Sequence, residues 1–224
     1  MVITENTKWI IFDVESVGLY GKAFAVGGGV FDPMNIATTN ISRGNDEFLF
    51  FRKWISKDGV TDIQQRKEDI KWLENNIPNL SYDFDPAIRV MSHTYLKQHF
   101  LDWLILTTKK YSGSDILIAA DCPFPVETNF LSVCLSSHPK QTKLSPYPFI
   151  DIASVMLAAD IDPMLCHKRT IKELPQHNPL FDARQSARLL GIALLKLKNQ
   201  HQLGSLIRTL ANTIKYDDLL ENKI

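Results

Sequence analysis

Two short, almost continuous apolar runs constrain the fold most: WIIFDV at residues 9–14 and DILIAA at residues 115–120. Runs of this kind are typical of strands that are buried on both faces. Such strands need helices on both sides of their sheet, because each face must be covered by another apolar layer. We therefore expect an α/β protein.

Further strands are expected at residues 23–31, 47–54 and 148–152, which gives a mixed five-stranded sheet flanked by helices. The remaining segments are predicted to be helical at residues 62–75, 95–111 and 126–136, from about 152 to 159, and from about 181 onward. No repeat or low-complexity linker interrupts this order. We expect a single domain over residues 1–224, with a helical C-terminal tail at residues 200–224.

The charge balance argues against one class of function. Lys+Arg and Asp+Glu number 25 each, so the formal net charge is zero. A polybasic protein that binds nucleic acid mainly through counterion release is therefore not expected. A local basic rim beside an acidic pocket is compatible with this balance.

Three cysteines, Cys122, Cys134 and Cys166, occur without a CxxC pair. This odd number favours neither a disulfide framework nor a thiolate zinc site, and it fits a reducing compartment. The N-terminal segment carries charges early and has no long apolar run after a basic start. We therefore expect no signal peptide, no membrane partner and a cytoplasmic location.

The first candidate site residues are Asp13 and Glu15, at the end of the first expected strand. Residues two apart in a strand point to the same face, so the two carboxylates lie together. Like charges repel there unless a cation lies between them or water reaches them. Hard cations such as Mg²⁺ and Mn²⁺ prefer oxygen ligands. The pair indicates either a metal site or a solvated strand end.

Asp121 and Glu127 form a second group of candidates. Asp121 ends the strand at residues 115–120, and Glu127 lies in the first turn of the next helix. Each has a simple structural explanation, since Asp121 suits a turn before Pro123 and the helix dipole favours an acid such as Glu127. Both stay open as metal ligands.

His177 and Asp182 form the third group, at the start of the helix expected from about residue 181. An aspartate there is commonly a helix cap, and a loop histidine is commonly a surface residue. The spacing also allows a metal-bound Asp182 to lie beside His177 acting as a general base. An imidazole titrates near neutral pH and can take a proton from an attacking water.

The order and spacing of these residues resemble the DEDDh family of 3′→5′ exonucleases, which includes the proofreading subunit of bacterial DNA polymerase III and ribonuclease T. The stretch FDVESVGL at residues 12–19 is similar to the first motif of that family, D-x-E-T-T-G-L. The matching residues are Asp13, Glu15, Gly18 and Leu19, whereas Ser16 and Val17 replace the two threonines.

The stretch HNPLFDARQSARLL at residues 177–190 is similar to the last motif, H-x-A-x-x-D-A-x-x-x-A. The matching residues are His177, Asp182, Ala183 and Ala187, whereas Pro179 replaces the usual alanine. The middle motif, H-N-x-x-F-D-x-x-F-L, is present only in part. Glu127 has the proper distance to Phe130 but is not an aspartate, and Asp121 is an aspartate six residues too early. The resemblance spans about residues 9–192 and leaves the middle ligand open.

The resemblance implies a ribonuclease-H-like fold and hydrolysis with two divalent cations, Mg²⁺ or Mn²⁺. It implies the following metal ligands: Asp13, Glu15, Asp182 and either Asp121 or Glu127. It makes His177 the general base, and it places Ser16, Val17, Gly18 and Leu19 at the lip that receives the last nucleotide. The implied substrate is single-stranded or 3′-overhanging DNA or RNA, cut from the 3′ end to nucleoside 5′-monophosphates. Relatives in the ribonuclease branch are often dimers, which leaves a homodimer open.

Several neighbouring residues each have two possible roles that the sequence alone does not separate. Tyr20 and Phe24 are candidates for stacking on bases or for packing in the core or at its rim. Arg184 and Arg188 are expected on the exposed face of the last helix, where they touch phosphates or remain solvated. The glycines at 27–29 lack the pattern of a phosphate-binding loop, so we expect them to allow close packing.

Two other functions also remain open. One is a ribonuclease-H-like endonuclease, which uses a carboxylate cluster but does not need the spacing of His177 and Asp182. The other is a catalytically inactive nucleic-acid-binding member of the fold.

Overall fold

The computed structural model describes residues 6–39, 43–77, 86–136, 148–165 and 167–221, so Cys166 lies outside the described residues. The strands in these ranges are β1 (Lys8–Ser16), β2 (Ala23–Phe31), β3 (Asn45–Phe51), β4 (Ala87–Arg89), β5 (Ile116–Ala120) and β6 (Phe149–Asp151). The helices are α1 (Pro33–Thr39), α2 (Ile63–Asn76), α3 (His93–Lys110), α4 (Val126–Ser136), α5 (Ile152–Ala158) and α6 (Pro179–Glu221). Two short 3₁₀ turns are η1 (Ser56–Asp58) and η3 (Ile171–Glu173).

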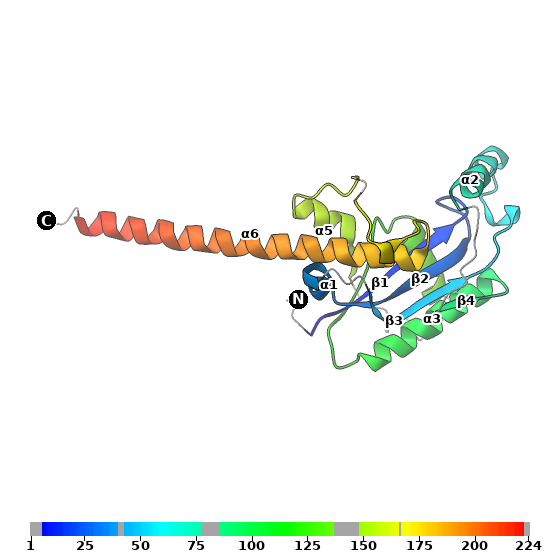
Figure 1. The fold of residues 1–224 in the computed structure, drawn as a ribbon, viewed down its shortest axis with the longest axis horizontal. Coiled ribbons are helices and arrows are strands. Elements are labelled where there is room, and N and C mark those ends of the chain that lie inside the picture. Colours follow the sequence, from blue (N-terminus) through cyan, green and yellow to red (C-terminus); the bar gives the residue numbers. More distant parts are fainter. Residues whose placement is uncertain (1–5, 40–42, 78–85, 137–147, 166, 222–224) are drawn as a thin grey trace.

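The strands form one mixed sheet in the order β4-β3-β2-β1-β5-β6 (Figure 1). Strand β2 is antiparallel to β1 and β3, whereas the pairs β1–β5, β5–β6 and β3–β4 are parallel. The expected mixed sheet with flanking helices is confirmed, but the expected number of five strands is wrong, since the described residues form six. The missed strand β4 has three residues at the sheet edge, too few to show alternation in the sequence.

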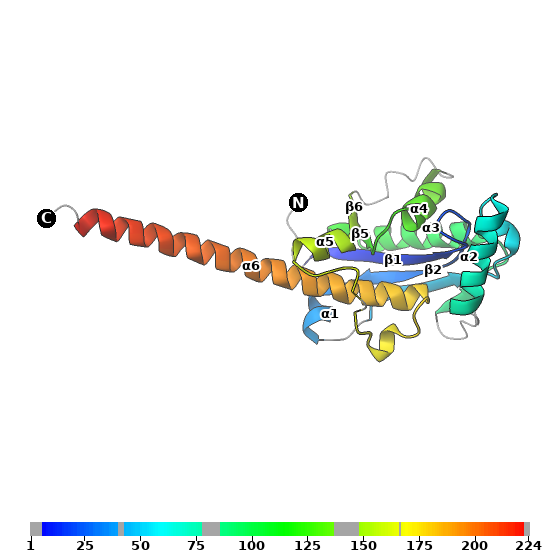
Figure 2. The ribbon, with the colours of Figure 1, turned by 90° about the horizontal axis from the view of Figure 1, so that it is seen from above.

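The side chains of β1 alternate between two apolar layers. Phe12 packs with residues of α3 and α4 on one face of the sheet, and Ile11 packs with residues of α1, α5 and α6 on the other. Figure 2 shows α3 and α4 on one side of the sheet and α1 and α6 on the opposite side. Because alternation continues along the strand, Asp13 and Glu15 lie on the face that α6 covers.

Helix α6 begins in close contact with β2, because glycine at position 27 leaves room for it. A Cβ atom at Gly27 would lie 2.4 Å from the backbone nitrogen of Leu180. Gly27 pairs with Asp13 across the β1–β2 ladder, so the first turn of α6 is held beside this aspartate. The expectation that the glycines of β2 allow close packing is confirmed.

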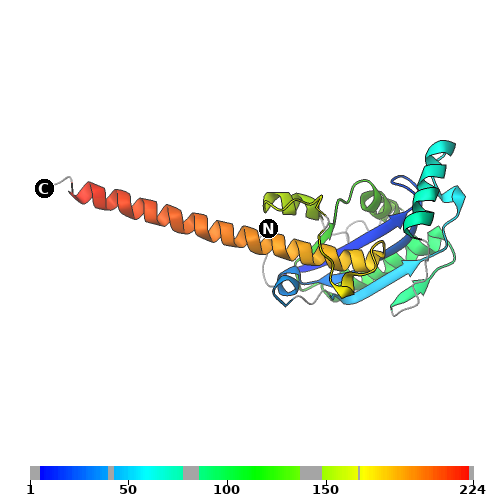
Figure 3. The same ribbon diagram turned by 45° about the horizontal axis from the view of Figure 1, so that its top comes forward.

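Helix α6 is a single helix of 43 residues, so the helices expected from about residue 181 and after residue 200 are parts of one element. Its N-terminal part packs on the sheet, whereas its C-terminal part extends beyond the sheet and its covering helices (Figures 1 and 3). No helix within the described ranges combines the length and the apolar character needed to cross a membrane.

Candidate active site

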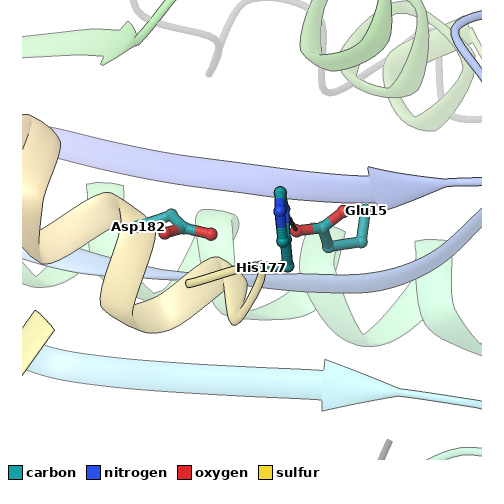
Figure 4. Close-up of side chains that lie close together, drawn as sticks. All are labelled: Glu15, His177 and Asp182. Carbon is teal, nitrogen blue, oxygen red and sulfur yellow. Dashed lines mark ion pairs between the residues drawn. The ribbon is translucent and has the colours of Figure 1, made fainter. Parts of the chain in front are cut away.

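Three side chains from distant parts of the chain converge near the end of β1. Glu15 belongs to β1, Asp182 to the first turn of α6, and His177 to the segment just before that helix. One ligand atom of each lies within 4.8 Å of the other two, and in the view of Figure 4 the imidazole lies between the carboxylates. The structure thus brings together two carboxylates and the histidine that the sequence singled out.

The start of α6 fixes the position of His177. The buried Asn178 caps the helix, since its Oδ1 accepts a hydrogen bond from the backbone N–H of Leu180 at 3.1 Å. His177 has a φ of 63°, in the left-handed region that turns the chain before the helix. Its Nδ1 lies 3.7 Å from Glu15 Oε1. Interaction with the Glu15 carboxylate raises the pKa of His177 above its usual value.

Asp13 belongs to β1, like Glu15, but is not one of the three residues whose ligand atoms meet within 4.8 Å among the described residues. Burial raises its pKa well above the usual value, and neighbouring carboxylates raise it further. In decreasing order of effect, these neighbours are Asp182, Glu127, Glu15 and Asp121. All the carboxylates that the sequence singled out therefore interact electrostatically with one residue of β1.

Glu127 reaches the site from the first turn of α4. Its side chain is buried, and its Oε1 accepts a hydrogen bond from the backbone N–H of Val14 at 3.2 Å. This contact ties the carboxylate to β1 between Asp13 and Glu15. Burial raises the pKa of Glu127 to about 8.

Asp121 follows the end of β5 and has different surroundings. Its Oδ1 is buried and has no hydrogen-bond partner within the described residues. Burial raises the pKa of Asp121, and the charge of Asp151 raises it further. Asp151 pairs with Ala120 at the end of β6, so it is a further acid at this edge of the sheet.

A pocket of about 490 Å³ opens beside these acidic residues. Three of the predicted lip residues line it, namely Ser16, Gly18 and Leu19, together with Trp72 and Asp69 of α2. Its volume is in the range of pockets that bind small molecules and cofactors.

The lip has a defined backbone shape. Gly18 has a φ of 69°, a backbone conformation that favours glycine, and a Cβ atom there would also meet the carboxylate of Asp69 at 2.2 Å. The hydroxyl of Ser16 donates to the carbonyl of Gly18 at 2.7 Å. The side chain of Val17 is fully buried, and its backbone N–H donates to Lys22 O at 3.3 Å. The side chain of Val17 thus packs into the core beneath the lip, whereas Ser16 and Gly18 line the pocket.

A second pocket of about 310 Å³ adjoins the first, and both are lined by Leu19 and Tyr20. Tyr20 is 67% exposed, so its ring is available for stacking. Phe24 is fully buried in the core, and its interpretation as a base-stacking residue is wrong. It faces inward because it belongs to the central strand β2, whose residues are all buried.

The expected exposure of Arg184 and Arg188 is also wrong. Arg184 pairs with Glu47 of β3, with an Nη2–Oε2 distance of 2.6 Å, and only 14% of its side chain is exposed. Arg188 pairs with the fully buried Glu173 of η3, with an Nε–Oε1 distance of 2.7 Å. Arg184 thus holds β3 against α6, and Arg188 holds η3 against the same helix. Each arginine supplies the positive charge that a buried carboxylate needs.

Sequence reasoning missed four residues around the site: Asp69, Trp72, Asp151 and Arg169. Asp151 carries a signal similar to that of Asp121, an acid at the end of a strand, and could have been found by it. Trp72 contacts the ring of His177 edge-on, with centroids 5.1 Å apart, but α2 gave no local pattern that points to a site. Arg169 donates to Asp182 Oδ1 at 2.5 Å, and nothing in its own sequence neighbourhood indicates this contact.

The donor set fits a hard divalent cation. It consists of carboxylate oxygens with one imidazole nitrogen, and carboxylates gathered in a desolvated site repel one another unless a cation compensates them. The unpartnered buried Oδ1 of Asp121 is a further oxygen that a cation or its bound water would satisfy.

Comparison with models of known protein families finds no match, and comparison with curated protein sequences finds none either. The site geometry and the two short motifs at residues 12–19 and 177–190 therefore carry the functional assignment.

Proposed function

We propose that the protein is a metal-dependent 3′→5′ exonuclease that releases nucleoside 5′-monophosphates from single-stranded or 3′-overhanging nucleic acid. The observation that carries the proposal is the convergence of His177 and Asp182 on Glu15, within 4.8 Å. These residues are far apart in the sequence and are the ones for which the DEDDh resemblance implies catalytic roles. A solvated strand end or an isolated helix cap does not explain why all three meet.

In this proposal the carboxylates hold two divalent cations, Mg²⁺ or Mn²⁺. When bound, the cations polarise the phosphate, lower the pKa of a water molecule and neutralise charge on the leaving 3′ oxygen. The residues that would hold them are Asp13, Glu15, Asp182 and one middle carboxylate. His177 would take a proton from water as general base once the charge of Glu15 is compensated by a bound cation.

We assign the middle position to Glu127 rather than to Asp121. Glu127 affects the pKa of Asp13 more than Asp121 does, and its hydrogen bond to Val14 fixes it against β1. Asp121 is coupled mainly to Asp151, on the β6 side. In this assignment Asp121 is not a metal ligand and lies beside the site, on the side of β6.

The pocket beside the cluster is the proposed site of the 3′-terminal nucleotide. Leu19 and Trp72 offer apolar surfaces to a base within it, and base stacking on such surfaces does not require a particular sequence. The adjoining pocket, lined by Tyr20, Lys22 and His93, suits the preceding nucleotide, since Lys22 supplies a positive charge for a phosphate.

The sheet is compatible with the ribonuclease-H-like fold that we propose for this chain. Its first three strands form an antiparallel meander, and β5 and β6 extend the sheet in parallel on the other side of β1. Strand β4 is an additional short strand at the opposite edge.

The test is to incubate 3′-labelled and 5′-labelled single-stranded DNA and RNA with the protein and Mn²⁺. Stepwise release of mononucleotides from the 3′ end is expected, and EDTA should abolish it.

His177→Ala should slow release by about 100-fold or more, because general-base catalysis contributes about that factor, while Mn²⁺ binding persists. His201→Ala, an exposed histidine farther along α6, is the matched control and should behave as the wild type. Cleavage of circular single strands would instead indicate an endonuclease, and failure to degrade either polymer would refute the proposal.

A further inference from the structure

Arg169 is the one arginine that the described structure places in direct contact with the acidic cluster. Its Nη1 lies 2.5 Å from Asp182 Oδ1, and only 16% and 14% of the two side chains are exposed. The same Nη1 donates to the backbone carbonyl of Glu173 at 2.9 Å. Oδ1 of Asp182, a proposed metal ligand, is therefore already paired with the fixed positive charge of Arg169.

The segment that carries Arg169 is held firmly against α6. Glu173 is fully buried and accepts two hydrogen bonds from Arg188, at 2.7 and 3.0 Å. Arg188 also donates to the carbonyl of Lys168 at 2.8 Å, and Arg184 donates to that of Lys172 at 3.2 Å. These contacts fix the backbone on both sides of Arg169, so its guanidinium is positioned by the fold.

The contact has an electrostatic consequence. A guanidinium cannot be deprotonated in proteins, so its charge persists at every accessible pH. It offsets the mutual repulsion of Asp13, Glu15 and Asp182, and it repels a divalent cation that approaches the same oxygens.

We propose that Arg169 is an internal counter-cation of the acidic site, which holds Asp182 in the metal-free protein and competes with a divalent cation for its carboxylate. This rests on the proposed function, since it concerns the cation that the exonuclease reaction needs. Arg169 is a positioning residue here, acting through Asp182. It makes the folded protein tolerate an empty acidic site, at the cost of weaker cation binding.

The experiment measures Mn²⁺ binding to the full-length protein at pH 8 by calorimetry, together with the melting temperature in EDTA. Arg169→Gln should bind Mn²⁺ about tenfold more tightly, because a unit charge near a divalent ion in a partly exposed site has an effect of that order. It should also melt several degrees lower in EDTA. Arg169→Lys keeps the charge, and its Mn²⁺ affinity should stay within about threefold of the wild type.

Lys172→Gln is the matched control, since it removes the same charge from an exposed position of the same segment and should change neither property. Unchanged or weaker Mn²⁺ binding by Arg169→Gln would overturn the proposal, because a merely structural role predicts that result. If Arg169→Gln does not fold, an NMR titration of the wild type tests the same proposal. The ¹⁵N signal of the Arg169 side chain should shift as Mg²⁺ is added, and a constant signal would refute competition between Arg169 and the cation for Asp182. A wild type that binds Mn²⁺ without this competition leaves the proposed function standing, whereas absence of binding in every variant refutes both.

Discussion

Glu127 and Asp121 differ in how they are connected to β1, and this predicts different effects of their removal. Glu127→Gln keeps an oxygen that can accept the hydrogen bond from Val14, so at pH 5, where folded Glu127 holds its proton, the melting temperature should change by no more than about 2 °C. The substitution removes a proposed ligand charge, and kcat/KM should fall by about 100-fold or more, beyond the 10–100-fold that outer-shell partners cost. Asp121→Asn should cost about tenfold or less. Steady-state kinetics with Mn²⁺ and thermal melts provide the measurements.

The opposite order of losses would assign the middle position to Asp121. Equal and small losses would mean that neither carboxylate is a ligand.

Trp72 provides a second test at the scale of a single residue. Its side chain is 47% exposed and lines the pocket next to Leu19, so Trp72→Ala should affect stability little. Loss of base stacking should raise KM by about tenfold, in line with about 1–3 kcal/mol per stacked base, with kcat within about threefold. Trp72→Phe should retain most of the affinity. Leu106→Ala, at an exposed apolar residue on α3, serves as the control.

Trp72 also contacts His177, and the kinetic split separates the two roles. A fall in kcat without a change in KM would show that the indole serves only to orient the imidazole.

Among the elements, the contact between β2 and α6 has the largest effect on the site. Gly27→Ala would place a methyl group 2.4 Å from the Leu180 backbone nitrogen, and backbone cannot yield as a flexible side chain does. Destabilisation of about 2–4 kcal/mol is expected, with loss of activity because His177 and Asp182 shift away from β1. Gly113→Ala meets no atom within 4 Å and should change stability by no more than about 0.5 kcal/mol. Urea denaturation measures both, and similar stabilities for the two variants would contradict the predicted close approach.

The elements that could be predicted are those with a repeated local signal. Strands β1, β2 and β5 are continuous apolar runs, and α6 has a long apolar stripe, so their existence follows from period and length. Strand β4 has only three residues and is stabilised by pairing with β3, which no local pattern reveals. Helix α1 is also short, with seven residues, but its start could have been read from Asp32 and Pro33, since Asp32 Oδ1 accepts the N–H of Asn35 at 3.1 Å.

The same division holds for the candidate site. Asp13, Glu15, His177 and Asp182 could be selected because each lies near the end of a strand or the start of a helix within a spaced motif. Arg169, Asp69 and Trp72 reach the site from segments that meet it only in three dimensions. Charge alone misled the prediction for Arg184, since an arginine on an amphipathic helix looks solvated until its partner, Glu47 of β3, is known.

For the whole molecule, the acidic site predicts how stability depends on pH without metal. The pKa of Glu127 is raised from 4.5 to about 8, and that of Asp182 from 3.8 to about 6. An acid with a raised pKa in the folded state binds its proton more tightly there than in the unfolded chain. Its stabilising effect is complete below the unfolded pKa and is lost as pH rises through the folded pKa. In EDTA, the melting temperature should therefore fall as pH rises from about 5 to about 8.

Divalent cations should reverse this trend, because they bind the ionised carboxylates of the folded protein. At a concentration 100-fold above its Kd, a cation stabilises by about 2.7 kcal/mol, which corresponds to a rise of about 5–10 °C in the melting temperature. The rise should be largest at pH 8 and small at pH 5, where protons occupy the site. Thermal melts in EDTA and in Mn²⁺ at both pH values measure the difference, with Glu127→Gln as the variant that should flatten the EDTA profile. A metal-free protein that becomes more stable between pH 5 and 8 would show that its carboxylates are already compensated by the protein itself, and that the site does not need a cation.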